Sequence, residues 1–282
     1  MPVALADAAA PLWRERRDRG GCWGTMDFAA VALLIAAGLA GGTIASLAGG
    51  AALITFPSLM AVGLTPVAAI ATNIAALTPG SFTAALSDRS QLPPFDRGFV
   101  GLVFASVVGA GIGAVLLMLT PSRTFEILVP LLIGFATVLF AFGEQISNAL
   151  RARSLAKHGR EPEIKLTSIP MLLPVSVYGG YFAAGVGVLL VAVLQLATSG
   201  QYRPANATKN LVAALNGSVA MAVFAIDGSI NWPAALSMMG GALIGSFIGA
   251  RIARYAPKEL MRWVVTAIGV ILTAVYAWRY WF

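Results

Sequence analysis

The chain has 282 residues, of which 58% are hydrophobic and only 11% are charged, with a formal net charge of +7. Soluble domains carry about 25% charged residues, so a chain this poor in charge could not cover its own surface in water. The basic residues lie in the breaks between apolar runs, where the positive-inside rule places them, and this distribution excludes a nucleic-acid-binding protein. The composition therefore predicts an all-α, polytopic membrane protein.

The chain begins with a basic segment, residues 1–27, which contains an arginine cluster from Arg14 to Arg19. No short apolar region with a cleavage site follows this cluster, so we do not expect a signal peptide. The single cysteine, Cys22, excludes an internal disulfide and a thiol metal cluster. The single histidine, His158, lies in a hydrophilic stretch, so we expect no metal site.

Five long stretches then contain no Asp, Glu, Lys or Arg: 28–87, 98–121, 166–201, 210–226 and 228–250. A helix needs roughly 20 apolar residues to span a bilayer. These stretches are long enough to do so, and they are too many to be buried helices of a soluble core. We therefore expect a transmembrane helical bundle.

The apolar stretches divide into two sets of elements in the same order. Residues 28–146 are expected to hold a glycine-broken segment over 28–63, then helices over 67–86, 98–119 and 124–143. A hydrophilic linker follows over 147–165, which we expect to be cytoplasmic. Residues 166–282 are expected to repeat the order over 168–199, 204–226, 233–253 and 259–280.

The sequence itself contains traces of this repeat. The offset that places Gly109 on Gly245 also places Thr72 on Thr208, and it aligns GAGIGA with GSFIGA. We therefore predict two homologous repeats. The general abundance of glycine in membrane helices is the alternative explanation.

The first segment of each repeat is too long for one plain span and is interrupted by glycine. Gly49 and Gly50 lie inside the first such segment, and Gly185 and Gly187 lie at the equivalent place in the second. Non-helical backbone is tolerated in a membrane only where it is buried or lines a cavity, and paired interrupted segments mark transporter binding sites. We predict a re-entrant or discontinuous helix in each repeat, with a kinked span as the alternative.

The charge distribution favours inverted repeats without establishing them. The linker belongs in the cytoplasm, and the loop 227–232, which has no positive charge, belongs outside. A re-entrant segment over 168–199 followed by one span would satisfy both. Inversion would however place the basic segment 1–27 outside, against the same rule, so the side of the N-terminus stays open.

Two stretches resemble the TauE/SafE sulfite-exporter family: GGTIASLAGGAALITFPSLMAVGLTPVAAIATNIAAL and YGGYFAAGVGVLLVAVLQLATSGQYRPANATKNLVAALN. The shared features are a glycine-rich segment, a proline-flanked stretch and an Ala-Thr pair in the next helix, in both halves. The resemblance covers residues 28–280 and implies transport of sulfite, sulfoacetate or related C2 sulfonates. The family's usual GiGGG is reduced here to LAGGA and AAGVG, which leaves the substrate open.

A sulfur oxyanion needs hydrogen-bond donors and positive potential, which the N-termini of half-helices supply. We therefore predict that the anion binds near the middle of the membrane, between the repeats. The predicted binding residues are Gly49, Gly50, Ala51, Thr72, Asn73, Gly185, Gly187, Thr208, Lys209 and Asn210. The residues expected to line the pathway, unless they only bond between helices, are Thr78, Ser81, Asn206, Asn216 and Ser218.

Lys209 is the candidate for direct charge pairing, because a lysine at membrane depth is costly and marks a functional site. The alternative is that Lys209 lies near a helix end and extends to the lipid headgroups, which the nearby Arg203 favours. The neighbouring Thr208, Asn206 and Asn210 could likewise be helix caps.

These features predict a secondary transporter for small sulfur-containing anions in a bacterial inner membrane. A channel-like anion permeator and a membrane scaffold remain alternatives. The sequence has no Walker-type loop, and its spans hold neither an acidic pair nor a histidine cluster, so we expect neither ATP coupling nor an enzyme. We expect no cofactor, and the coupling ion, proton or sodium, stays open. The expected partners are the anionic organosulfur substrate, the lipid bilayer and, since GxxxG spacing suits it, a homodimer partner.

Overall fold

The computed structural model describes residues 27–47, 50–158, 169–197, 202–252 and 258–281. Within these residues the chain forms ten α-helices and a short 3₁₀-helix, with no β-strand. Five of the helices are long and apolar enough to cross a membrane, over 28–45, 66–87, 97–119, 122–143 and 204–227. The prediction of a helical, multi-pass membrane protein is confirmed.

The first half of the chain consists of α2 (Phe28–Leu47), α3 (Ala52–Ala61), α4 (Pro66–Ser87), η2 (Arg89–Gln91), α5 (Arg97–Leu119) and α6 (Ser122–His158). The second half consists of α7 (Ile169–Tyr181), α8 (Val186–Ala197), α9 (Tyr202–Asp227), α10 (Trp232–Ile252) and α11 (Lys258–Trp281). Helix α6 continues into the predicted linker because the residues there, NALRARSLAKH, are mostly good helix formers.

Local signals explain where the central helices begin. Helix α4 starts with Pro66, whose fixed φ suits the first helical position, after the extended residue Thr65. Helix α5 starts at Asp96, whose carboxylate accepts a hydrogen bond of 2.8 Å from the backbone N–H of Phe99.

Two helix pairs approach each other so closely that only glycine fits between them. A Cβ on Gly42 of α2 would overlap the carbonyl oxygen of Ala242 in α10, and a Cβ on Gly180 of α7 would overlap that of Ala110 in α5. The pair α2–α10 and the pair α5–α7 therefore use the small-residue packing that is typical of membrane helices.

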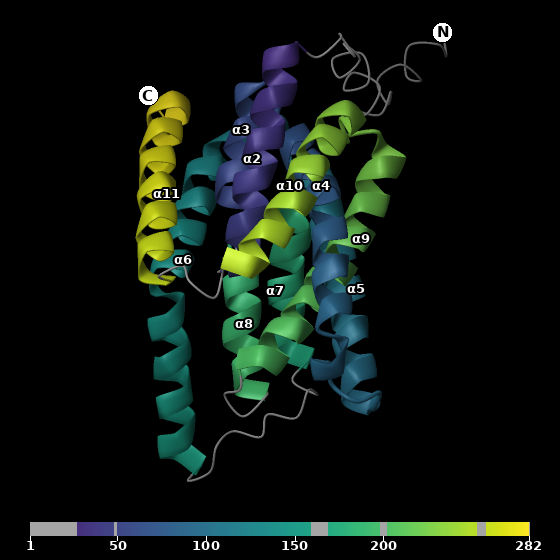
Figure 1. Cartoon of the computed structure of the whole chain (residues 1–282), viewed down its shortest axis with the longest axis vertical. Helices are drawn as coiled ribbons and strands as arrows, with labels where there is room; N and C mark the ends of the chain where they lie inside the picture. The colour runs from purple at the N-terminus through teal and green to yellow at the C-terminus, as the bar shows by residue number, and fades with distance from the viewer. Residues whose placement is uncertain (1–26, 48–49, 159–168, 198–201, 253–257, 282) are drawn as a thin grey trace, which may run out of the picture.

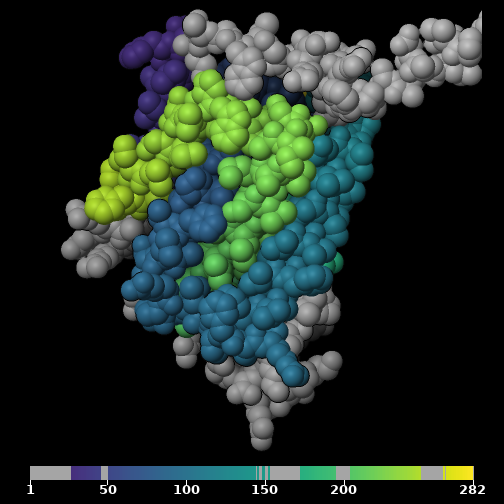
Figure 2. All heavy atoms as spheres, turned by 90° about the vertical axis from the view of Figure 1, so that its right-hand side faces the viewer, coloured from purple at the N-terminus to yellow at the C-terminus, as the bar shows by residue number. Residues whose placement is uncertain are grey.

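The helices are arranged around α4 and α9, which contact each other. Figure 1 shows α2 and α3 in the upper half of the molecule and α7 and α8 in the lower half, with α6 and α11 packed together at one side. Figure 2 shows α9 and α10, in green, beside α4, in blue, on the face turned toward the viewer.

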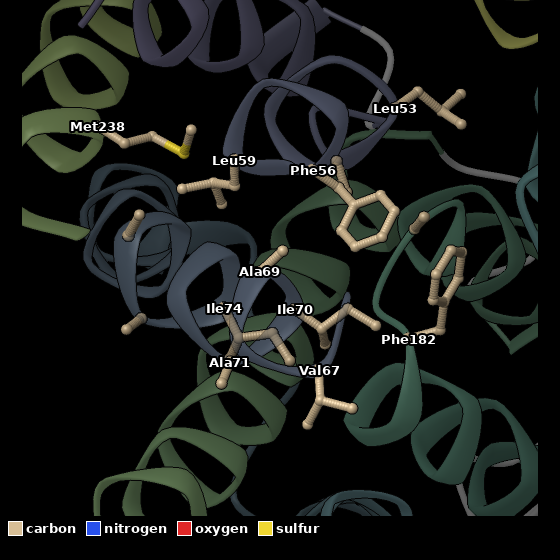
Figure 3. Close-up of a cluster of buried hydrophobic side chains, with 14 of the residues drawn as sticks. Leu53, Phe56, Leu59, Val67, Ala69, Ile70, Ala71, Ile74, Phe182 and Met238 are labelled. Carbon is tan, nitrogen blue, oxygen red and sulfur yellow. The ribbon is translucent and has the colours of Figure 1, made fainter. Parts of the chain in front are cut away.

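The buried apolar core joins the two halves. Figure 3 shows side chains of α3 and α4 packed together with Phe182, which follows α7, and Met238 of α10. The rings of Phe56 and Phe182 meet edge to face with their centroids 5.7 Å apart. The end of α7 is thus in direct contact with α3.

Candidate functional site

The chain leaves helical geometry between α7 and α8. Phe182 to Gly185 connect the two helices, with Ala183 at φ 64° and Gly185 at φ 75°. The hydroxyl of Tyr178 donates a hydrogen bond of 2.7 Å to the carbonyl oxygen of Ala184 and holds this connection. Within the described residues, the amide N–H of Gly187, at the start of α8, donates no hydrogen bond.

Gly50, directly before α3, also has positive φ, at 126°. A Cβ on Gly50 would lie 2.8 Å from the ring of Phe140 in α6, and a Cβ on Gly185 would lie 3.1 Å from the Cβ of Ala136 in the same helix. Ala136 and Phe140 are one helical turn apart, about 6 Å along the axis. Both interruptions therefore meet the same short stretch of α6.

Helices α4 and α9 contact each other near the middle of their apolar spans. A Cβ on Gly217 of α9 would overlap the hydroxyl of Thr78 in α4. Thr78 and Gly217 lie close to the centres of the spans 66–87 and 204–227. The hydroxyl of Thr78 donates a 2.6 Å hydrogen bond to the carbonyl oxygen of Ile74, so this polar atom is satisfied inside its own helix.

Lys209 lies on α9 and is enclosed by protein, with 7% of its surface exposed. It is the one charged side chain classed as buried in the described part of the chain. Ala205 and Val212, one turn to either side, belong to a buried cluster with Leu102 of α5 and Leu190 of α8. Within the described residues, the ammonium group has no ion pair or hydrogen bond. A buried cation without a partner is costly, so this position suits an anion.

Asn216 lies two turns further along α9, at the centre of its apolar span. It is 4% exposed, and in the described structure neither its amide nitrogen nor its amide oxygen has a hydrogen-bond partner. Its Nδ2 lies 3.1 Å from the position of a Cβ on Gly179, next to the end of α7. The hydroxyl of Ser176, fully buried one turn earlier on α7, also has no partner.

The two threonines of the repeat lie inside their helices and not at the caps. Helix α4 begins at Pro66 and α9 at Tyr202, which excludes the interpretation of Thr208 as an N-cap. The hydroxyl of Thr72 accepts a 3.0 Å hydrogen bond from the backbone N–H of Asn231, before α10. The hydroxyl of Thr208 donates one of 2.8 Å to the carbonyl oxygen of Pro204 in its own helix.

The remaining predicted site residues are distributed as follows. Asn73 is buried on α4 with its Oδ1 unpartnered, and Ala51 is buried at the start of α3. Gly187, Asn206, Asn210, Ser81 and Ser218 are half-buried on their helices, the last with its hydroxyl bonded to Ala214. Gly49 lies outside the described residues.

The sequence interpretation missed Ser176. A serine in an apolar helix ordinarily bonds back to its own helix, as Ser106 does to Leu102 at 2.7 Å, so its type and position gave no signal. Its importance follows from tertiary packing, because its Cβ lies 2.7 Å from the position of a Cβ on Gly109 of α5.

The described residues include a cationic donor at Lys209, an amide at Asn216 and a hydroxyl at Ser176, which are types of group that bind oxyanions in proteins. In the part of the chain that the structure describes, no three His, Cys, Asp or Glu side chains lie together as metal ligands would.

Comparison with known proteins identifies the family of the chain. The family model described as "Sulfite exporter TauE/SafE" matches residues 34–276. A "Probable membrane transporter protein" of Haemophilus influenzae is 23% identical over 86% of this chain and 93% of its own length. "Probable membrane transporter protein ORF9" of a Sinorhizobium species is 26% identical over 87% of this chain and 91% of its own. "Probable membrane transporter protein YunE" of Bacillus subtilis is 26% identical over 84% of this chain and 95% of its own. No solved structure matches the chain significantly.

Proposed function

The chain belongs to the TauE/SafE sulfite exporter family of membrane transporters, and we propose that it moves small sulfur-containing anions across the bacterial inner membrane. The proposed substrates are sulfite, sulfoacetate and other C2 sulfonates. The anion binds near the middle of the membrane, on the face of α9 that carries Lys209 and Asn216.

The observation that carries this proposal is the burial of Lys209 without an anionic partner in the described structure. A lysine that extends to the headgroups keeps its ammonium group in the interface, whereas this side chain is enclosed by helices. An anion that binds beside it neutralises a charge that is otherwise costly inside the membrane. The burial therefore favours a binding role over an interfacial one.

We also propose that the two halves are inverted repeats that enclose the site. The contacts support this: α2 packs on α10 as α7 packs on α5, and α4 contacts α10 as α9 contacts α5. The pairs α2–α3 and α7–α8 occupy opposite halves of the molecule in Figure 1, and both interruptions contact α6. Interrupted segments that meet between two inverted repeats form the binding sites of many secondary transporters.

The experiment compares anion binding by the purified wild type and Lys209→Gln. Sulfite, sulfoacetate, taurine, isethionate and sulfate are each added, and thermal unfolding is followed in detergent. A ligand that binds only the folded protein at a hundred times its Kd stabilises it by about 2.7 kcal/mol. We expect Lys209→Gln to weaken anion binding by at least about 30-fold, because the lost charge pair is worth about 2 kcal/mol or more.

Arg123→Gln is the matched control, because Arg123 is a solvent-accessible cation at the start of α6. It should bind the anion as the wild type does. If Lys209→Gln and Arg123→Gln respond equally, Lys209 is not a binding residue. If no anion stabilises the wild type, the proposed substrate class is wrong.

A channel-like permeator of the same architecture is tested in liposomes. Uptake of labelled sulfite that saturates with concentration and accumulates against a gradient supports a transporter. Conductive flux that never saturates supports a channel.

A further inference from the structure

Ser176 of α7 and Asn216 at the centre of α9 have hydrogen-bonding groups without a partner in the described structure. Asn216 offers its amide N–H groups and its carbonyl oxygen, and Ser176 offers its hydroxyl. Both residues are at least nine-tenths buried. Buried polar groups in native proteins nearly always have partners, so each such group calls for an explanation.

Contacts between helices place these groups in the same part of the molecule. The Nδ2 of Asn216 lies 3.1 Å from the Cβ position of Gly179. Gly179 and Ser176 are three residues apart on α7, which separates their Cβ positions by about 5–6 Å. Helices α5, α7 and α9 contact one another around this point, so the groups are enclosed. Lys209 lies about 10 Å away along the axis of α9.

The chemistry of the two side chains restricts the ligand. An amide needs both an acceptor for its N–H groups and a donor for its carbonyl oxygen, and a hydroxyl can act as either. This requirement stays the same if the amide oxygen and nitrogen of Asn216 exchange places, because neither atom has a partner in the described structure. A fully deprotonated anion satisfies only donors and would leave a buried carbonyl oxygen unpaired.

We infer that Asn216 and Ser176 select an anion that carries a hydrogen-bond donor of its own besides its anionic oxygens. This inference rests on the proposed function and deepens it. Hydroxyl- or amino-bearing C2 sulfonates and the protonated form of sulfite belong to this class. Sulfate and unsubstituted alkanesulfonates do not, and among the proposed substrates the site favours those with a donor over sulfoacetate. A site built to bond a substrate hydroxyl rejects the analogue that lacks it, because its own groups are then left unpaired.

The test uses isethionate and ethanesulfonate, which share a sulfonate group and a two-carbon chain and differ by one hydroxyl. Their apparent Kd values are measured from thermal stabilisation of the purified wild type. We expect isethionate to bind at least about tenfold more tightly than ethanesulfonate.

Asn216→Leu keeps the branching and the number of side-chain heavy atoms, adds volume, and removes both polar atoms. We expect the Kd values of this variant for isethionate and ethanesulfonate to differ by less than about threefold. The main reason is that the hydroxyl of isethionate loses its hydrogen-bond partner. Asn216→Leu loses no protein hydrogen bond but overpacks its site, so the melting temperature without ligand is compared for Ser176→Ala, which adds no volume and should keep it unchanged. A structural role would instead lower that temperature.

Ser176→Ala provides a second variant that can hardly fail to fold, since it removes only an unpartnered hydroxyl. It should reduce the preference for isethionate partially. Ser237→Ala on α10 is the control, because that hydroxyl is bonded to the carbonyl oxygen of Pro233. It should keep the full preference.

The outcomes separate the two proposals. Equal binding of isethionate and ethanesulfonate to the wild type overturns this inference and leaves the proposed function standing. A preference that persists in both Asn216→Leu and Ser176→Ala also overturns it. If neither these sulfonates nor sulfite stabilises the wild type, the proposed function fails and the inference fails with it.

Discussion

The two halves of the molecule pack alike but use their polar side chains differently. Glycines let α2 approach α10 as closely as α7 approaches α5. In the first half, however, the hydroxyl of Thr72 on α4 accepts a hydrogen bond from Asn231 N–H, and the Asn231 side chain in turn accepts one from Ala234 N–H. These polar groups support the start of α10.

In the second half the corresponding helix leaves its polar groups available. Thr208 bonds only to its own helix, and Lys209 and Asn216 have no partner among the described residues. Asn73, which the sequence offset aligns with Lys209, is neutral, and its buried Oδ1 has no hydrogen-bond partner in the described structure. The same packing scheme therefore supports the start of α10 in one half and leaves Lys209 and Asn216 without partners among the described residues in the other.

The largest expected effect on stability tests the similarity of the halves. Gly241→Ala on α10 would place a methyl group against the carbonyl oxygen of Ile35. Gly180→Ala on α7 would place one against the carbonyl oxygen of Ala110. Overpacking of this kind costs about 1–3 kcal/mol or more, and we expect comparable losses from both substitutions. Thermal unfolding in detergent measures them.

The matched control lies one residue away, since a Cβ on Gly240 would have no atom within 4 Å. Gly240→Ala should be neutral or slightly stabilising, because alanine is the better helix former. If only one of Gly241→Ala and Gly180→Ala destabilises the protein, the two helix pairs are not equivalent in packing.

The interruption between α7 and α8 gives the second prediction. Gly185 has positive φ and its Cβ position is 3.1 Å from Ala136, so Gly185→Ala should destabilise the protein by about 1–3 kcal/mol. Gly111 lies within α5, does not have positive φ, and a Cβ there would make an ordinary 3.6 Å contact with Val219, so Gly111→Ala should raise stability by about 0.5–1 kcal/mol. Urea or heat titration of both variants decides this, and equal effects would contradict a need for left-handed backbone at Gly185.

Much of the fold could be predicted from the sequence, because the bilayer sets the length of each charge-free stretch. The bounds of α4, α5, α9, α10 and α11 lie within a few residues of those expected, whereas α6 extends to His158. Positive φ at Gly50 and Gly185 could be expected, because glycine adopts it without steric cost. Positive φ at Ala183 could not, because alanine rarely adopts it. The homology of the repeats remains a prediction.

The candidate site could be predicted only in part. Lys209 stood out because an isolated charge in an apolar run is rare. Ser176 did not, because whether a serine hydroxyl finds a partner depends on which helix packs over it, and here that is α5 at Gly109. Asn216 was expected only along the pathway, since its place beside Gly179 arises from contacts between helices distant in sequence.

The smallest expected effect tests the difference between the halves directly. Thr72→Val and Thr208→Val each replace a buried hydroxyl by a methyl group of similar volume. The first leaves the Asn231 N–H without its acceptor and should cost about 1–2 kcal/mol. The second removes a bond within α9 that adds little to helix stability, so its cost should stay within about 0.5 kcal/mol. Equal losses of stability in thermal unfolding would mean that Thr208 supports the structure as Thr72 does. The proposed difference between α4 and α9 would then be wrong.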